Sequence, residues 1–206
     1  MKVILLNGSP HAHGSTNCAL EVVAGELNAS GIETEIIHVG HLSVRGCISC
    51  LQCRRLGHCI FDDKVNEVAA KFEEADGLVV GSPVYYAGAA GTITSFMDRL
   101  FYCTSFSKRM KVGAAVASAR RAGTIATLDQ LNKYFSIAEM PIVSSRYWNE
   151  VHGNSPEETL QDAEGMQIMR VLGRNMGFLI KAIRAEKERS GLPEEEPSRI
   201  HTNFIR

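Results

Sequence analysis

Residues 1–17 read MKVILLNGSPHAHGSTN, and this stretch decides the fold. Lys2 to Asn7 is a short aliphatic run of strand length, and the Gly-Ser-Pro turn at 8–10 ends it. From about Ser15 to Ala29, apolar residues return at helical spacing. A strand, a polar loop and a helix in this order begin a β-α-β unit, which predicts a parallel sheet.

The rest of the chain repeats this alternation. Further strands are expected at 32–39, 77–82 and 111–117, and a fifth opens at 141–143. Helices are expected from about 62, over 92–102 and 123–139, and in a last long segment with Met169, Leu172, Met176, Leu179 and Ile183 on one face. Five strands that alternate with helices predict one α/β domain with helices on both faces of the sheet.

Composition excludes several classes of function. The chain has 206 residues, 45% of them hydrophobic and 22% charged, with a formal net charge of -1. This balance excludes a strongly basic nucleic-acid binder. The longest stretch without a charged residue, 77–97, contains Pro83 and four glycines and is not a membrane helix. With no signal peptide expected at the N-terminus, the prediction is a soluble cytoplasmic protein without membrane or nucleic-acid partners.

Four of the six cysteines gather in one short segment, as Cys47, Cys50, Cys53 and Cys59. In a reducing compartment such a cluster more often binds a metal than forms disulfides. Four thiolates with two successive C-x2-C steps suit a [4Fe–4S] cluster, whereas zinc ligands are more often split into two distant pairs. Free thiols are the plain alternative. Cys18 and Cys103 lie in helical patterns and are expected in the core.

Ligands of parallel sheets bind beyond the carboxyl ends of the strands, which directs attention to three loops at 8–17, 82–91 and 118–124. The first loop offers hydroxyls and backbone N–H groups at a helix start, an arrangement that binds phosphate. It matches neither G-x-G-x-x-G nor G-x-x-x-x-G-K-[ST]. The alternative is a polar loop in which Ser15 or Thr16 caps the helix.

The second and third loops carry aromatic and cationic residues. In the second, Ser-Pro at 82–83 is followed by two tyrosines and then by small residues that admit a flat ring. Packing of both tyrosines on the adjacent helix is the alternative. The third has two arginines at a helix start, where cations oppose the helix dipole, and this favours an anion site over a solvated turn.

The three loops together resemble the NADPH-dependent FMN reductase and flavodoxin-like family. The residues that carry this resemblance are Gly8-Ser9-Pro10, Gly14-Ser15-Thr16, the stretch 81–86 and Phe96-Met97-Asp98-Arg99. The C-x2-C-x2-C-x5-C spacing followed by Asp62-Asp63 is similar to the iron–sulfur flavoprotein subgroup, as is the stretch from 147–149 to 173–175.

The resemblance implies a flavodoxin-like three-layer sandwich with a five-stranded parallel sheet in the order 2-1-3-4-5. It implies an FMN-binding domain over 1–190 with a cysteine-rich insertion at 44–61, followed by a C-terminal tail at 191–206. It also implies that the protein pairs with copies of itself as a homodimer or homotetramer.

The resemblance also implies a set of cofactor-binding residues. Phosphate would be held by Ser9, Ser15, Thr16 and Asn17, with His11 where the family usually has a basic residue and with Arg120 or Arg121 as further cations. The isoalloxazine would be lined by Pro83, Val84, Tyr85, Tyr86 and Gly88. Its other side would be closed by Ser118, Arg120, Arg121 and Gly123. No residue is assigned a catalytic role, because flavin chemistry needs no catalytic triad.

The predicted function is that of an FMN-dependent oxidoreductase. It would take electrons from NAD(P)H, or exchange them with a [4Fe–4S] cluster on the four cysteines, and pass them to a quinone-like or protein acceptor. A simple NAD(P)H:FMN reductase with unmetallated cysteines is the alternative among enzymes. A zinc-containing, non-catalytic binding module is the alternative from another class.

Overall fold

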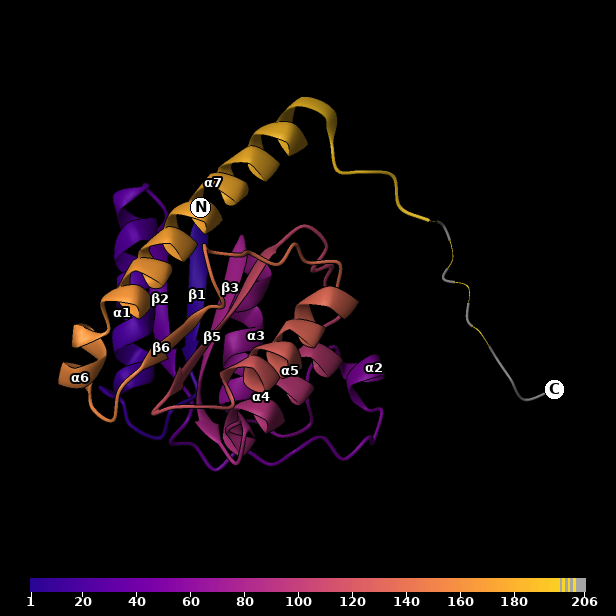
Figure 1. Ribbon diagram of the computed structural model, residues 1–206. Coiled ribbons are helices and arrows are strands. Elements are labelled where there is room, and N and C mark those ends of the chain that lie inside the picture. The colour runs from indigo at the N-terminus through magenta and orange to yellow at the C-terminus, as the bar shows by residue number, and fades with distance from the viewer. Residues whose placement is uncertain (197, 199, 201, 203–206) are drawn as a thin grey trace.

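The computed structural model describes residues 1–196, 198, 200 and 202. Five parallel strands form the main sheet in the order β2-β1-β3-β5-β6 (Figure 1). Their bounds are Lys2–Asn7 for β1, Glu33–His38 for β2, Gly77–Tyr85 for β3, Val112–Ala119 for β5 and Glu150–His152 for β6. This is the flavodoxin-like order predicted from the sequence, and the reversal of strand order lies between β1 and β3.

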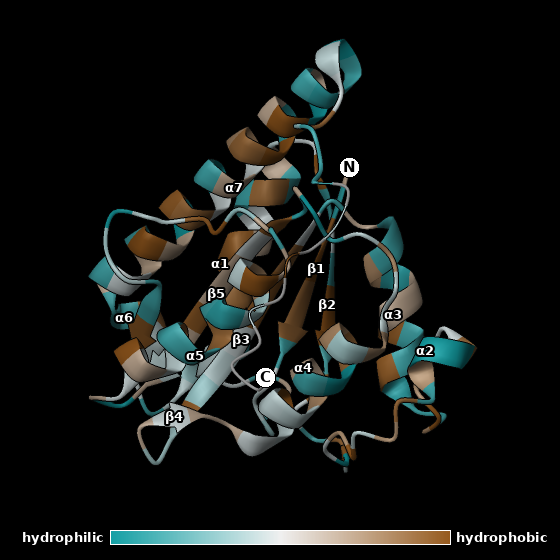
Figure 2. Cartoon of the chain, turned by 90° about the vertical axis from the view of Figure 1, so that its right-hand side faces the viewer, coloured by the Kyte–Doolittle hydropathy of each residue, from teal (hydrophilic) through white to brown (hydrophobic). Residues whose placement is uncertain are grey.

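The central strands are buried on both faces, because helices cover both sides of the sheet. In β1, Val3 and Leu5 contribute to one core cluster, and Ile4 and Leu6 contribute to the other. Every residue of β5 is buried. Such continuous apolar strands are characteristic of parallel sheets. Figure 2 shows brown, hydrophobic strands between helices that carry both hydrophobic and hydrophilic residues.

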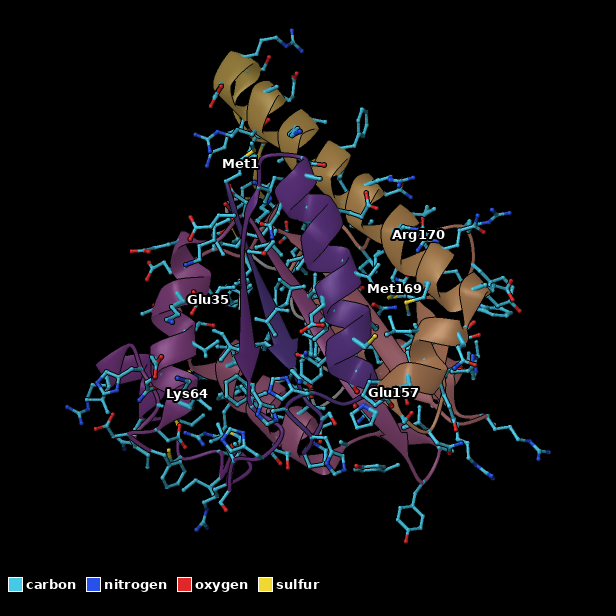
Figure 3. The ribbon with its side chains drawn as sticks, turned by 90° about the vertical axis from the view of Figure 1, so that its left-hand side faces the viewer. Met1, Glu35, Lys64, Glu157, Met169 and Arg170 are labelled. Carbon is cyan, nitrogen blue, oxygen red and sulfur yellow. The ribbon has the colours of Figure 1, made fainter. Side chains whose placement is uncertain are left out.

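The helices form two outer layers (Figure 1). One layer contains α1 (Ser15–Ala29), α6 (Pro156–Gln161) and α7 (Ala163–Ser190). The other contains α3 (Lys64–Glu74), α4 (Gly91–Cys103) and α5 (Thr124–Ile137), with the single-turn α2 (Cys53–Leu56) beside it. Along α7, buried Met169 lies on the side that faces α1, whereas exposed Arg170 points away (Figure 3).

The fifth strand differs from its prediction. Residues 141–143 pair with the start of β5 only through an isolated bridge at Ile142. The chain then leaves the sheet and returns as β6, at 150–152, beside the end of β5. Asn149 stabilises this detour, since its side chain donates to the Val143 carbonyl at 3.3 Å and accepts from the Ser145 hydroxyl at 2.8 Å. The edge strand is thus interrupted, and the sequence prediction identified only its first contact.

Beyond α7 the chain is extended where it is described. The Arg109 guanidinium donates to the carbonyls of Pro193 at 2.8 Å and Glu194 at 3.0 Å. The predicted tail, 191–206, lies in part outside the described residues, since 197, 199, 201 and 203–206 are not among them. Within the described part of the chain, no helix combines the length and apolar character needed to cross a bilayer.

Candidate functional site

The loop after β1 is built around the side chain of Asn7, which is fully buried. Its Oδ1 accepts from the Ser9 backbone N–H at 3.0 Å, and its Nδ2 donates to the Ala12 carbonyl at 3.2 Å. The Ser9 hydroxyl in turn accepts from the His11 N–H at 3.2 Å. These bonds hold the loop in one conformation before any ligand arrives.

The N-terminus of α1 opens at this loop without a capping side chain. Gly14 occupies the N-cap position in an extended conformation, and no side chain among residues 1–196 accepts a hydrogen bond there. The first N–H groups of a helix have no intrahelical partner, and the helix dipole adds a partial positive charge. The sequence alternative, a cap by Ser15 or Thr16, is therefore wrong. The geometry leaves these N–H groups available to an anion.

A buried contact joins this helix start to the end of β5. The Thr16 hydroxyl lies 2.7 Å from the Ser118 hydroxyl, and both residues are buried. The first and third loops are therefore connected directly, although their residues are 102 positions apart. One hydroxyl donates to the other, so one further hydroxyl hydrogen remains for an acceptor in the cleft.

The end of β2 and the loop after it pack against the first loop at Ser9. A Cβ added at Gly40 would lie 2.1 Å from the Ser9 carbonyl oxygen, so only glycine permits this close approach. The Gly40 N–H donates to the Asn7 carbonyl at 3.0 Å. A ring nitrogen of His38 lies 2.8 Å from the Ser9 carbonyl. The backbone position of Ser9 is thus determined by the Asn7 side chain and by contacts from residues 38–40.

The second loop forms a tight hairpin. Val84 and Tyr85 at the end of β3 pair antiparallel with β4 (Gly88–Ala89). Tyr86 and Ala87 form the two-residue turn and both have left-handed backbone angles, with φ of 49° and 60°. Tyr85 is about half exposed, whereas Tyr86 projects fully into solvent. The hairpin therefore separates two tyrosines that are neighbours in the sequence.

The three loops enclose an open cleft of about 780 Å³ at the carboxyl ends of β1, β3 and β5, the lower edge of the sheet in Figure 1. It is lined by nine of the predicted cofactor residues, namely Ser9, His11, Ser15, Thr16, Pro83, Val84, Tyr85, Ser118 and Arg120. The other five predicted residues are not part of this lining, namely Asn17, Tyr86, Gly88, Arg121 and Gly123.

Two of these five have evident structural roles. The Asn17 amide donates to the Glu21 carboxylate at 2.7 Å and its oxygen accepts from Asn7 at 3.4 Å, so its polar atoms are occupied within the fold. Gly123 has a φ of +94°, and a Cβ there would lie 2.7 Å from Val84. It allows the third loop to approach the hairpin closely.

One wall of the cleft was not predicted. The cleft is also lined by four residues that follow β6, namely Gly153, Asn154, Ser155 and Pro156. Ser155 caps α6, accepting from the Glu158 N–H at 3.3 Å, and Pro156 takes the first helical position. The Ser-Pro-Glu-Glu sequence is a signal for a helix start. The sequence prediction placed the fifth strand at 141–143 instead of 150–152. It therefore did not indicate that this helix start directly follows a strand.

The cysteine segment lies beside α4 and forms a second candidate site. Cys47, Cys50, Cys53 and Cys59 line one small, mostly apolar pocket. Between the first three, Ser49 and Leu51 have left-handed φ angles of 53° and 59°, a conformation that is costly for residues other than glycine. Such strain is typical of loops that wrap a ligand.

The donor set in this pocket consists of thiols. Among the described residues, no three His, Cys, Asp or Glu side chains converge as they would around a single metal ion. Ligands of a cubane lie farther apart than ligands of one ion, since each binds a different corner. Four thiols around a common pocket are the number and type of ligand that a [4Fe–4S] cluster requires.

The two remaining cysteines are core residues, as predicted. Cys18 and Cys103 are both buried. Burial raises the pKa of the Cys103 thiol to about 11, so it is a neutral thiol near pH 7. Cys103 also lines the cysteine pocket.

The fold and the cleft together define a class, that of flavodoxin-like proteins with an uncapped helix start and an aromatic hairpin at the carboxyl edge of the sheet. The chain belongs to the NADPH-dependent FMN reductase family, whose family model matches residues 1–155. Membership in this family makes it an FMN-dependent oxidoreductase.

Comparison with curated proteins agrees with this membership. The chain is 33% identical over 192 residues to an iron-sulfur flavoprotein of Methanocaldococcus jannaschii, covering 89% of this chain and 100% of that protein. It is 26% identical over 197 residues to an iron-sulfur flavoprotein of Methanosarcina thermophila, covering 92% and 100%.

Solved structures show the same fold. RosB, determined with bound 8-demethyl-8-formylriboflavin-5'-phosphate, superposes with a TM-score of 0.71 at 14% identity, covering 100% of this chain and 93% of that one. The NAD(P)H:quinone oxidoreductase of Methanothermobacter marburgensis has a TM-score of 0.62 at 16% identity, covering 85% and 96%. At these identities the similarity establishes the fold.

Proposed function

We propose that the cleft binds FMN with its phosphate at the N-terminus of α1 and its isoalloxazine ring beside the hairpin. The observation that carries this proposal is the uncapped helix start, where N–H groups face a cleft lined by Ser9, Ser15 and Thr16. A dianionic phosphate is the ligand best suited to such N–H groups and hydroxyls. Arg120, at the cleft edge, adds a compensating positive charge.

The ring would lie against apolar and aromatic groups. Pro83, Val84 and Tyr85 form one side of the cleft, and 118–120 form another. Bound FMN supplies hydride and single-electron chemistry, and the protein contributes position, hydrogen bonds and exclusion of water. The five predicted residues outside the lining have no direct role in this proposal.

The second part of the proposal assigns a [4Fe–4S] cluster to Cys47, Cys50, Cys53 and Cys59. Its support is the shared pocket, the number and type of ligands, and the strained loop at 49–51. The relatives named iron-sulfur flavoprotein also favour it. The protein would then transfer electrons among NAD(P)H, FMN, the cluster and a quinone-like or protein acceptor, in the cytoplasm, as a homodimer or homotetramer.

The alternative within the same family is an NAD(P)H:FMN reductase that uses no cluster. Among the curated relatives is an NADPH-dependent FMN reductase of Escherichia coli, 28% identical over 129 residues. In that case the four thiols would be free, and the protein would carry flavin absorption bands only.

Two measurements on anaerobically purified protein test the proposal. The flavin released by denaturation is identified by chromatography, and iron and acid-labile sulfide are counted after reconstitution. FMN with about four irons per chain is expected. FAD, or no flavin after incubation with excess FMN, would contradict the cleft assignment. FMN without iron and sulfide would leave the cleft assignment intact and reject the cluster.

A further inference from the structure

Arg99 is the largest side chain in the fully buried core, with an exposed fraction of 1%. It lies on α4, outside the cleft. An arginine remains charged at any physiological pH, and burying its charge is costly unless each N–H group finds an acceptor. The acceptors of these N–H groups therefore indicate which part of the protein the buried guanidinium serves.

All five N–H groups of the guanidinium point at the cysteine segment and its flanks. Two donate to the Asp63 carboxylate, at 2.6 and 2.9 Å. Two donate to the carbonyls of Arg45 and Phe61, each at 3.3 Å. The fifth, Nε–H, donates to the Cys59 sulfur at 3.4 Å. The guanidinium thus joins both ends of the segment that contains the four cysteines.

Asp63 holds this arrangement in a defined orientation. Its carboxylate binds Arg99 in a bidentate manner and also caps α3, accepting from the Val65 N–H at 3.1 Å. The guanidinium also lies over the Phe61 ring, with its central carbon 5.0 Å from the ring centroid. Arg99 lies on α4 and Asp63 caps α3, so both partners of the ion pair are fixed by helices. The Nε–H of Arg99 cannot turn away from Cys59 without breaking this ion pair.

We propose that Arg99 is a positioning residue for Cys59 as a cluster ligand, and that its Nε–H···Sγ bond raises the reduction potential of the cluster. This inference rests on the cluster assignment made above. A cationic donor on a ligand sulfur withdraws negative charge from it, and reduction adds negative charge to the cluster. Hydrogen bonds to cluster sulfurs and nearby charge are known determinants of cluster potential.

A purely structural role makes a different prediction. If Arg99 only fastens the segment to α4, its replacement changes stability and iron retention but leaves the potential of the loaded protein unchanged. If its hydrogen bond acts on the sulfur, the potential falls in variants that keep the cluster. The midpoint potential therefore separates the two roles.

The experiment compares wild type, Arg99→Lys, Arg99→Met and Arg45→Met, each reconstituted anaerobically with iron, sulfide and FMN. Arg45 is a matched control, because it is an exposed arginine with its guanidinium carbon 5.6 Å from the same Phe61 ring, and its side chain makes no hydrogen bond to a cysteine within the described residues. Bound FMN reports folding of each variant, and cluster potentials are measured by redox titration with spectroscopic detection.

The expected order of potentials is wild type and Arg45→Met highest, Arg99→Lys lower and Arg99→Met lowest. Lysine keeps the positive charge but lacks the guanidinium group and its Nε–H donor. The Arg99→Lys variant therefore still tests the inference if Arg99→Met does not fold. Equal potentials in wild type and a loaded Arg99 variant would overturn the inference while leaving the cluster assignment intact. Failure of wild type to take up iron and sulfide would reject the cluster, and the inference with it.

Discussion

The hydroxyls of Thr16 and Ser118 lie 2.7 Å apart in a buried position, and this contact couples the first helix to the third loop. The two residues belong to different β-α units, so this hydrogen bond ties the first loop to the third. Together with the Gly40 contact behind Ser9, the bond preorganises one end of the cleft. Preorganisation reduces the entropy that a ligand must otherwise overcome on binding.

The first prediction concerns this pair. Thr16→Val and Ser118→Ala should each lower the free energy of unfolding by about 1–3 kcal/mol, because each leaves a buried hydroxyl partner unsatisfied. The double variant should cost less than the sum, since both polar groups are then removed. Denaturant unfolding of the four proteins measures the coupling, and strictly additive losses would show that the hydroxyls do not interact.

The second prediction concerns Gly40. In Gly40→Ala the new methyl group would overlap the Ser9 carbonyl, so we expect a loss of about 1–3 kcal/mol in stability together with weaker FMN binding. Gly25→Ala is the matched control, because Gly25 lies exposed within α1 with nothing within 4 Å of the added Cβ. It should gain about 0.5–1 kcal/mol and leave FMN affinity unchanged. Thermal melts and flavin titrations distinguish the two variants, and equal behaviour would refute the proposed crowding.

The third prediction separates the two tyrosines. Tyr85→Ala should alter the absorption or fluorescence of the bound flavin, because Tyr85 lines the cleft. Tyr86→Ala should leave both signals unchanged, because Tyr86 projects into solvent from the turn. Tyr86→Ala is thus the control for Tyr85→Ala. A larger spectral effect from Tyr86→Ala than from Tyr85→Ala would contradict the hairpin geometry.

The fourth prediction concerns Asp63. Asp63→Ala removes the carboxylate from buried Arg99 and the cap from α3. Removing one partner of a buried ion pair costs roughly 3–5 kcal/mol, and the low end applies here because the Asp63 side chain is partly exposed. Asp63→Asn keeps a capping oxygen and should lose less. Chemical denaturation tests this order, and equal losses would show that the capping oxygen kept by asparagine contributes nothing to stability.

Much of the fold could be predicted because local signals agree with tertiary structure. Three predicted elements each have one dominant pattern of hydrophobic residues, and the structure confirms all three as a strand or a helix. They are Lys2–Asn7, Ser15–Ala29 and Gly77–Ser82. The interrupted fifth strand could not be predicted in the same way. Its detour depends on the buried Asn149 side chain and its hydrogen bond to Val143, a contact that leaves no periodic pattern.

The predictions for the candidate site succeeded or failed for the same reason, namely the strength of the strand that precedes each loop. Loops that follow strong strands, such as those containing Ser9 and Pro83, were located from the sequence and line the cleft. The wall at 153–156 follows the weak strand and was missed. The bond between Arg99 and Cys59 joins positions 40 residues apart, and only the packing of α4 against the cysteine segment reveals it.

The central claim is that the FMN phosphate binds the first N–H groups of α1, and a single titration series tests it most directly. FMN and riboflavin are titrated into apoprotein of wild type, Ser15→Ala and Ser15→Pro. Proline is tolerated at the first helical position, and extended Gly14 is compatible with a following proline, so Ser15→Pro removes one N–H while preserving the helix.

For wild type, FMN should bind at least tenfold more tightly than riboflavin, since riboflavin lacks the phosphate. Ser15→Pro should weaken FMN by about tenfold or more, the equivalent of one charge-assisted hydrogen bond of roughly 1.5–3 kcal/mol. Its riboflavin affinity should stay unchanged, and Ser15→Ala, which keeps the N–H, should retain more FMN affinity. Equal binding of FMN and riboflavin by wild type, or unchanged FMN binding by Ser15→Pro, would contradict the account.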